Sequence, residues 1–157
     1  MTPSRAIVLG GLTVGLLDGL DAIIFFGLRG VHPARIFQAI SAGLLGRESF
    51  AGGLGTTLLG VLLHFCIATT IVAVFLLASR TLPNLSQRPF LWGPLYGLGV
   101  WVVMNCVVIP ASANPGGARP TAVVVNGILI HLVGVGLPAA LFARAAGRAG
   151  REVWRET

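Results

Sequence analysis

Four long apolar stretches dominate the pattern of hydrophobic and polar positions along the chain. They cover about residues 6–28, 50–79, 91–113 and 121–143, and arginine, proline and glycine collect between them. A helix of about 20 apolar residues crosses the hydrocarbon core of a bilayer, where every backbone polar group must be bonded internally. The pattern therefore predicts an all-α bundle of four transmembrane helices that forms one domain over residues 1–157.

The first stretch is expected to remain as a helix rather than to be cleaved as a signal peptide. Its apolar run is longer than a typical signal core, and it contains Asp18 and Asp21. No small-residue cleavage site follows it.

A shorter amphipathic segment lies between the first two spans, at about residues 33–46. Its apolar residues recur at helical spacing and its polar residues lie on the other side: Ile36, Phe37, Ile40 and Leu44 against Arg35, Gln38 and Ser41. Roughly 14 residues are too few to cross a bilayer. We expect an interfacial or re-entrant helix on the outer face.

Composition agrees with a membrane location. Hydrophobic residues make up 55% of the chain and charged residues 10%, whereas soluble domains have about 25% charged residues. The net charge is +6, but no clustered basic face interleaved with aromatic residues is present, so we expect no nucleic-acid partner. The two cysteines lie inside apolar stretches and predict no disulfide framework.

The arginines predict the orientation. With four spans, both termini share one side, which holds seven arginines: Arg5, Arg80, Arg88, Arg144, Arg148, Arg151 and Arg155. The other side holds Arg29, Arg35, Arg47 and Arg119. The positive-inside rule therefore predicts that both termini are cytoplasmic. The basic tail, residues 144–157, is expected to contact anionic lipid headgroups, with Trp154 as an interfacial anchor.

The second and fourth spans share a pattern that suggests an internal repeat. Each places a glycine four residues before a central histidine, Gly60 before His64 and Gly127 before His131. The first and third spans share pairs of glycines four residues apart: Gly11 and Gly15, Gly93 and Gly97. One interpretation is two parallel helical hairpins related by a pseudo-twofold axis along the membrane normal. The alternative is coincidence in a chain with 22 glycines.

A layer of polar residues is expected near the middle of the membrane. Helical spacing places Asp18, His64, Asn105 and His131 on the glycine-containing packing faces, and Asp21 lies at a similar depth. An ionised aspartate at the bilayer centre costs roughly 2.5–3.5 kcal/mol even on insertion scales, so both aspartates need partners or water. The histidines are the expected partners.

Three interpretations of this layer remain open. In the first, it binds an ion or relays protons in a small transport-type protein, because carboxylates and imidazoles exchange protons near neutral pH. In the second, His64 and His131 ligate a haem b, or a divalent metal together with the aspartates. In the third, the polar groups only join helices, and the protein is an accessory or scaffold subunit of a larger membrane complex, or a homo-oligomer.

Enzyme signatures are missing from the sequence. Ser41 has no histidine at a motif spacing, and no glycine-rich phosphate loop precedes a helix. We therefore expect no catalysis and, in the favoured interpretation, no cofactor.

Several segments carry a resemblance to known proteins. They are GLRGVHPARIFQAISAGLLG at residues 27–46, the Leu-His-Phe run around His64, and MNCVVIP at residues 104–110. Together they resemble small uncharacterised four-span bacterial inner-membrane proteins. The resemblance covers most of the chain and implies four spans in a bacterial inner membrane. It implies no activity.

Overall fold

The computed structural model describes residues 1–114 and 116–153, and within them the chain is helical with no strand. Four helices are long and apolar enough to cross a membrane: α1 (Pro3–Gly27), α3 (Gly53–Thr81), and two composite helices. The third joins α5 (Pro89–Val103) to the π-helical turn η2 (Met104–Val108). The fourth joins α6 (Thr121–Ile130), the π-helical turn η3 (His131–Gly136) and α7 (Leu137–Val153). The prediction of four apolar helices of spanning length is confirmed.

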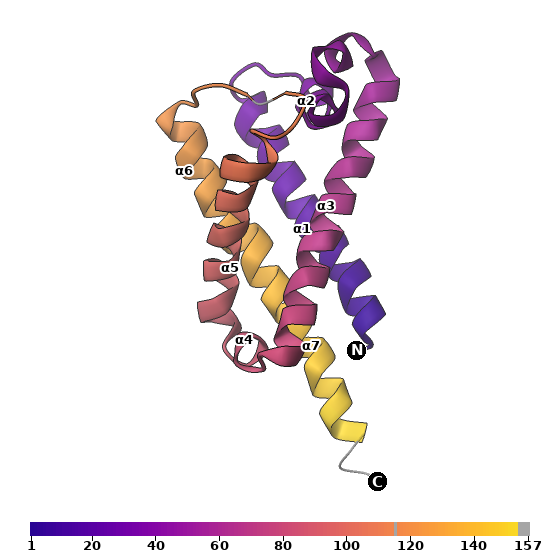
Figure 1. The fold of residues 1–157 in the computed structure, drawn as a ribbon, viewed down its shortest axis with the longest axis vertical. Helices are drawn as coiled ribbons and strands as arrows, with labels where there is room; N and C mark the ends of the chain where they lie inside the picture. The colour runs from indigo at the N-terminus through magenta and orange to yellow at the C-terminus, as the bar shows by residue number, and fades with distance from the viewer. Residues whose placement is uncertain (115, 154–157) are drawn as a thin grey trace.

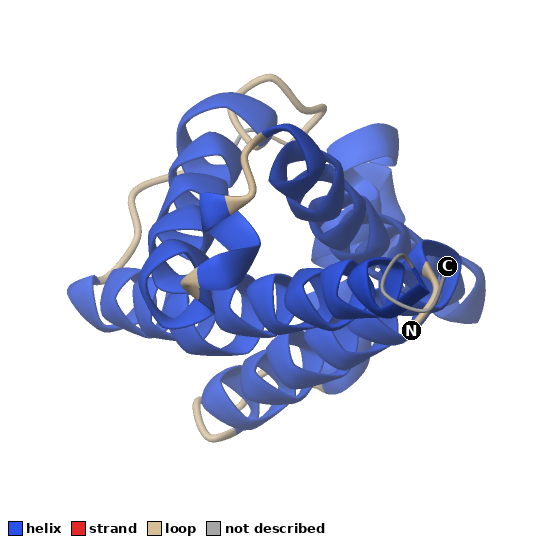
Figure 2. Cartoon of the chain, turned by 90° about the horizontal axis from the view of Figure 1, so that it is seen from below, coloured by secondary structure: helices blue, strands red, loops and turns tan. Residues whose placement is uncertain are grey.

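Short elements connect these helices. Between α1 and α3 lie α2 (Pro33–Leu45) and the 3-10 turn η1 (Gly46–Ala51), and α4 (Asn84–Gln87) joins α3 to α5. The start of α1 and the end of α7 lie at the same end of the bundle, and α2 lies at the opposite end (Figure 1). Figure 2 shows the loops that join the helices. The predicted headgroup contacts of Trp154 and of the arginines from Arg148 onward lie outside the described side chains.

Proline and glycine set the helix boundaries. α1 and α2 both begin at a proline, which has no N–H to leave unbonded at a helix start. The preceding residues cap them: Thr2 Oγ1 accepts from the Arg5 N–H at 3.4 Å, and His32 Nδ1 accepts from the Ala34 N–H at 3.2 Å. α2 ends at Gly46, whose φ of 69° suits glycine.

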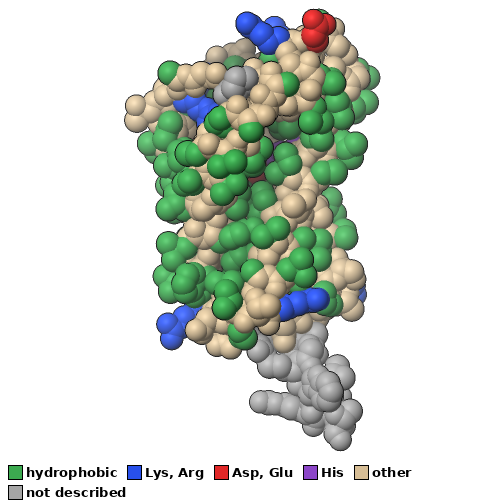
Figure 3. All heavy atoms as spheres, viewed as in Figure 1, with side chains coloured by type: hydrophobic (Ala, Val, Ile, Leu, Met, Phe, Trp, Pro, Cys, Tyr) green, Lys and Arg blue, Asp and Glu red, His purple; other side chains and the backbone are tan. Residues whose placement is uncertain are grey.

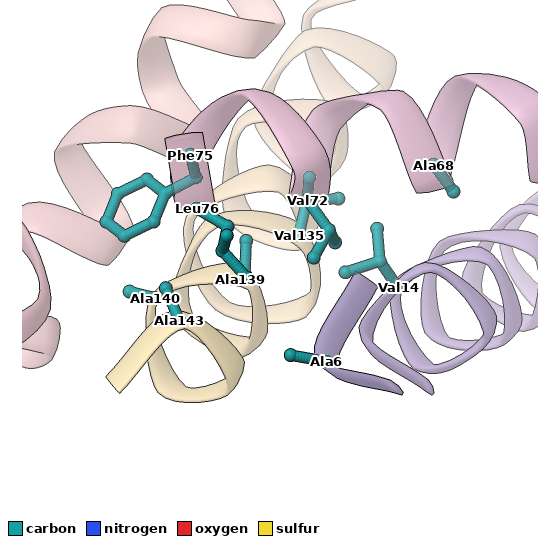
Figure 4. Packing of buried hydrophobic residues seen from close by; sticks show 10 residues of the cluster. All are labelled: Ala6, Val14, Ala68, Val72, Phe75, Leu76, Val135, Ala139, Ala140 and Ala143. Atoms are coloured by element: carbon teal, nitrogen blue, oxygen red, sulfur yellow. The ribbon is translucent and has the colours of Figure 1, made fainter. Parts of the chain in front are cut away.

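The core lies where α1, α3 and α7 meet, and most of its residues are small or β-branched (Figure 4). α1 approaches α3 through glycines. A Cβ added at Gly11 would lie 2.8 Å from the Thr69 Cα, and one at Gly15 would lie 2.6 Å from the Phe65 ring. Helices in lipid associate through such close packing because the surrounding chains are as apolar as leucine.

The third and fourth helices touch backbone to backbone. A Cβ at Gly97 would overlap the His131 carbonyl oxygen, and one at Gly136 would overlap the Gly93 carbonyl oxygen. A Cβ at Gly93 would lie 2.8 Å from the Leu137 Cα. Since backbone atoms cannot move aside as a flexible side chain can, glycine is required at this crossing.

The polar side of α2 faces the protein rather than water. Gln38 and Ser41 are buried, whereas Leu44 is 65% exposed. Gln38 Nε2 donates to the Gly53 carbonyl at 3.1 Å, and Ser41 and Ser49 both donate to the Gln38 carbonyl. These bonds join α2 to η1 and to the start of α3. The expectation of an amphipathic helix is met, but its outward side is largely apolar.

The outer surface matches a lipid environment. Large apolar side chains are exposed along all four long helices. Figure 3 shows a broad hydrophobic region with basic side chains near its two ends. Apolar side chains can face outward in this way because the spanning helices are surrounded by hydrocarbon rather than by water.

Adding one methyl group at Gly97 tests the close packing of the third and fourth helices. We expect Gly97→Ala to lower the free energy of unfolding by about 1–3 kcal/mol, because the added Cβ overlaps the His131 backbone. The matched control is Gly99→Ala, two residues along the same helix, where a Cβ meets no atom within 4 Å. Thermal unfolding in detergent measures both, and an equal melting temperature for the two variants would contradict the packing described.

Candidate polar cleft inside the membrane span

A cleft of about 230 Å³ lies between α1, the third helix and the fourth helix. Polar side chains from these elements line it: Asp18 and Asp21 from α1, Asn105 from η2, Asn126 from α6, and His131 from η3. Trp101 lies among them, and Arg119 from the loop before α6 also lines the cleft. Two carboxylates, an imidazole, two amides and a guanidinium therefore border one small space.

Asp18 stands between this cleft and His64. The His64 ring does not line the cleft; it packs against Gly15 and Gly19 of α1 and edge-on against Phe65. Its Nε2 donates to the Gly15 carbonyl oxygen at 2.8 Å, which leaves Nδ1 facing Asp18 Oδ2 at 4.0 Å. A bare Nδ1 and a carboxylate would repel each other, so a proton on either group makes the contact favourable.

Asp21 is joined to a different helix. Asn126 Nδ2 donates to Asp21 Oδ2 at 2.7 Å, across the gap between α1 and α6. This bond is a direct polar tie between α1 and α6, the part of the fourth helix that otherwise touches α1 little. It supplies one partner to the carboxylate and leaves its other oxygen available to the cleft.

Both π-helical turns occur at cleft residues. η2 contains Asn105, and η3 begins at His131. A π-helical turn adds a residue to one turn, which changes the direction of side chains and often marks functional sites. Asn105 Nδ2 donates to the Trp101 carbonyl at 2.7 Å, and His131 Nδ1 donates to the Gly127 carbonyl at 2.8 Å. These bonds orient the two side chains and leave His131 Nε2 as the ring nitrogen without a described partner.

The polar residues lie toward the α2 end of the bundle. At 1.5 Å per residue, Asp18, His64 and His131 are about 4–5 Å from the midpoints of their helices, and Asn105 about 10 Å. All are displaced in the same direction. The layer is therefore thicker than expected and lies on the α2 side of the helix midpoints, the side on which the sequence placed it.

The structure brings four of the five predicted residues to one cleft and places the fifth, His64, behind Asp18. Three lining residues were not among the predicted site residues: Trp101, Arg119 and Asn126. Trp101 lies one turn before Asn105, so periodicity contained the signal for Trp101. Asn126 is five residues before His131, a spacing that α-helical periodicity does not place on one face. Arg119 lies in the loop before α6, where helical spacing gives no signal, and it also lines the cleft.

The geometry bears on the haem and metal interpretation. Both ring nitrogens of His64 face groups of this chain, the Gly15 carbonyl and Asp18, so neither is directed at a shared ligand with His131. In the described part of the chain, no three His, Cys, Asp or Glu side chains form a group that could hold a metal ion. A haem between His64 and His131 would require the His64 ring to leave both partners.

The two hairpins resemble each other in one respect and differ in another. In each hairpin, the second glycine of the pair on the first helix contacts the central histidine of the second helix. Gly15 contacts the His64 ring, and Gly97 contacts the His131 backbone. However, α1 and α3 are continuous α-helices, whereas both helices of the second hairpin contain a π-helical turn. An internal repeat stays a prediction from the sequence.

Four apolar helices of spanning length define the class: this is an all-helical membrane protein with a polar cleft within its span. Comparison with known proteins adds no family, because no family model, curated protein or solved structure matches the chain significantly. The resemblance to four-span bacterial proteins accordingly remains an expectation from the sequence.

The contribution of the Asp21–Asn126 bond to stability can be measured by comparison with Asn105, whose side-chain amide bonds only within its own helix. We expect Asn126→Ala to lower the free energy of unfolding by about 1–2 kcal/mol and to speed hydrogen exchange over residues 121–126, because α6 loses its polar tie to α1. Asn105→Ala is the matched control, since its bond reaches only Trp101. Equal exchange over residues 121–126 in the two variants would refute the tie.

Proposed function

We propose that the protein binds a proton or a small cation in the cleft and belongs to the transport type of membrane protein. The observation that supports this proposal best is the cleft itself, in which Asp18 and Asp21 face the same 230 Å³ space inside a membrane span. Intramembrane ionisable residues are rare and costly, and they mark ion and proton pathways. Two of them beside one cleft are more than helix association requires.

The chemistry of the site suits positively charged species. With both carboxylates ionised, Arg119 charged and His131 neutral, the cleft has one net negative charge. A proton or monovalent cation would neutralise it. Asn105 and Asn126 supply amide oxygens as neutral ligands, and the Asp18–His64 pair supplies a site from which a proton can pass to the cleft.

Flux through reconstituted protein tests the proposal. Proteoliposomes are assayed for proton and cation uptake under an imposed gradient, with the wild type and the variants Asp18→Asn and Asp21→Asn. Each substitution keeps the shape of the side chain and removes its charge. We expect flux to fall roughly tenfold or more, equivalent to about 1.4 kcal/mol on the barrier.

The matched control is Glu48→Gln, which makes the same chemical change at an exposed carboxylate in η1. We expect it to leave flux unchanged. Equal flux in all variants, with folding intact, would show that the cleft carboxylates are not the site. A wild type without flux that copurifies stoichiometrically with a larger complex would favour the accessory-subunit alternative, and a Soret band in purified protein would favour the haem alternative.

We also propose that the protein lies in a bacterial inner membrane with both termini in the cytoplasm and α2 on the outer face. The support is the excess of arginines at the terminal end and the resemblance to four-span bacterial proteins. In intact cells, a membrane-impermeant maleimide should label a cysteine introduced at Glu48 and not one introduced at Gln87. Labelling of Gln87→Cys alone would show that the protein has the opposite orientation.

A further inference from the structure

A second and larger hollow lies on the side of the bundle, between α3 and α5. It has a volume of about 560 Å³, within the ~300–1,000 Å³ typical of ligand sites. α3 and α5 both pack against α7, but their backbones stay apart and Tyr96 bridges them, packing edge-on against Phe75. α4 lies at the end of the groove that holds the start of α1. The residues of this α3–α5 groove are almost all apolar, including Ile71, Phe75, Trp92, Val100 and Met104.

The few polar atoms in the groove already have partners. Tyr96 Oη donates to the Ile71 carbonyl at 2.7 Å, and Thr70 Oγ1 donates to the Cys66 carbonyl at 2.8 Å. An occupant at this depth therefore needs no polar group and gains nothing from one. Since the groove lies between two spans, the hydrocarbon chains of the bilayer have direct access to it.

A positive charge stands at one end of the groove. Arg88 is the N-cap residue of α5, and its carbonyl oxygen accepts at 3.0 Å from the N–H of Trp92, which lines the groove. Its side chain is exposed, and no carboxylate among the described side chains pairs with it. An arginine at the end of a spanning helix lies at the level of the lipid headgroups. An apolar slot that ends at such a cation is complementary to an anionic lipid.

We propose that the α3–α5 groove binds one anionic phospholipid, with an acyl chain in the groove and the phosphate of the headgroup at Arg88. This site is distinct from the polar cleft, which lies on the other side of α5, and from the basic tail. Apolar contact alone would not select it over bulk lipid, because lipid chains are equally apolar elsewhere. Selectivity comes from the shape of the groove and from Arg88.

Gly99 allows the groove to be filled without disturbing the fold. It lines the groove, and a Cβ added there meets no atom within 4 Å. Gly99→Phe therefore places a ring where the acyl chain would lie. Gly55→Phe is the matched control, because Gly55 is also exposed with open space around its Cβ but lies outside the groove.

Native mass spectrometry of the full-length protein, released from detergent with phosphatidylglycerol or phosphatidylcholine added, measures retained lipid directly. We expect the wild type to retain one phosphatidylglycerol and to prefer it over phosphatidylcholine. Gly99→Phe should abolish that retention, and Gly55→Phe should not change it. Arg88→Gln should reduce the preference about fivefold, the effect of about 1 kcal/mol for one arginine near an anionic headgroup.

Arg5→Gln is the control for general charge, since Arg5 lies at the same end of the bundle on α1, which does not line the groove. The tail arginines are present in all proteins compared, so their contribution cancels. Retention that is equal in Gly99→Phe and Gly55→Phe, an equal effect of Arg5→Gln and Arg88→Gln, or no preference between the two lipids would each overturn the proposal.

Discussion

The close approach of helix backbones at glycine is the constraint on which the rest of the structure depends. Within lipid, burying apolar side chains gains little over leaving them exposed, so helices must gain contact through packing at short range. Gly11 and Gly15 allow α1 to lie against α3, and Gly93, Gly97 and Gly136 allow the third and fourth helices to touch backbone to backbone. These two closely packed helix pairs meet at the small residues of α7. The cleft and the groove lie where helices of different pairs are not in close contact.

The polar cleft follows from an asymmetry between the two pairs. α1 and α3 remain regular, and His64 closes their interface by bonding the Gly15 carbonyl. In the second pair, the π-helical turns at Asn105 and His131 interrupt the regular spacing, and the space beside them is lined by polar side chains. The aspartates of α1 face this space rather than lipid, which is how two carboxylates are tolerated inside the span.

Much of the architecture could be predicted from the sequence because bilayer thickness leaves few choices. The four spans follow from the length of the apolar stretches, and the glycine spacing correctly indicates the packing faces of α1 and α5. Asp18, Asp21, Asn105 and His131 were expected in one layer, and all four line the cleft.

The features that could not be predicted depend on which neighbouring helix or loop each helix face contacts. Periodicity placed His64 on a packing face, but only the three-dimensional crossing sets it behind Asp18 rather than in the cleft. The buried Gln38 and Ser41 bond to Gly53 and Ser49 of the following segments, and no periodic pattern records these partners. Arg119 belongs to an irregular loop, so its approach to the cleft has no signal in helical spacing.

The central claim is that Asp18 and Asp21 form a site that exchanges protons or cations from within the membrane span. Infrared difference spectroscopy of protein reconstituted in lipid, recorded between acidic and alkaline pH, observes carboxyl groups directly. The account predicts a reversible carboxyl signal that Asp18→Asn or Asp21→Asn diminishes and that an added transported cation shifts. The part of the signal that Glu48→Gln removes, from an exposed carboxylate, should not shift with the cation. A carboxyl signal that is the same in the wild type and in both aspartate variants would contradict it.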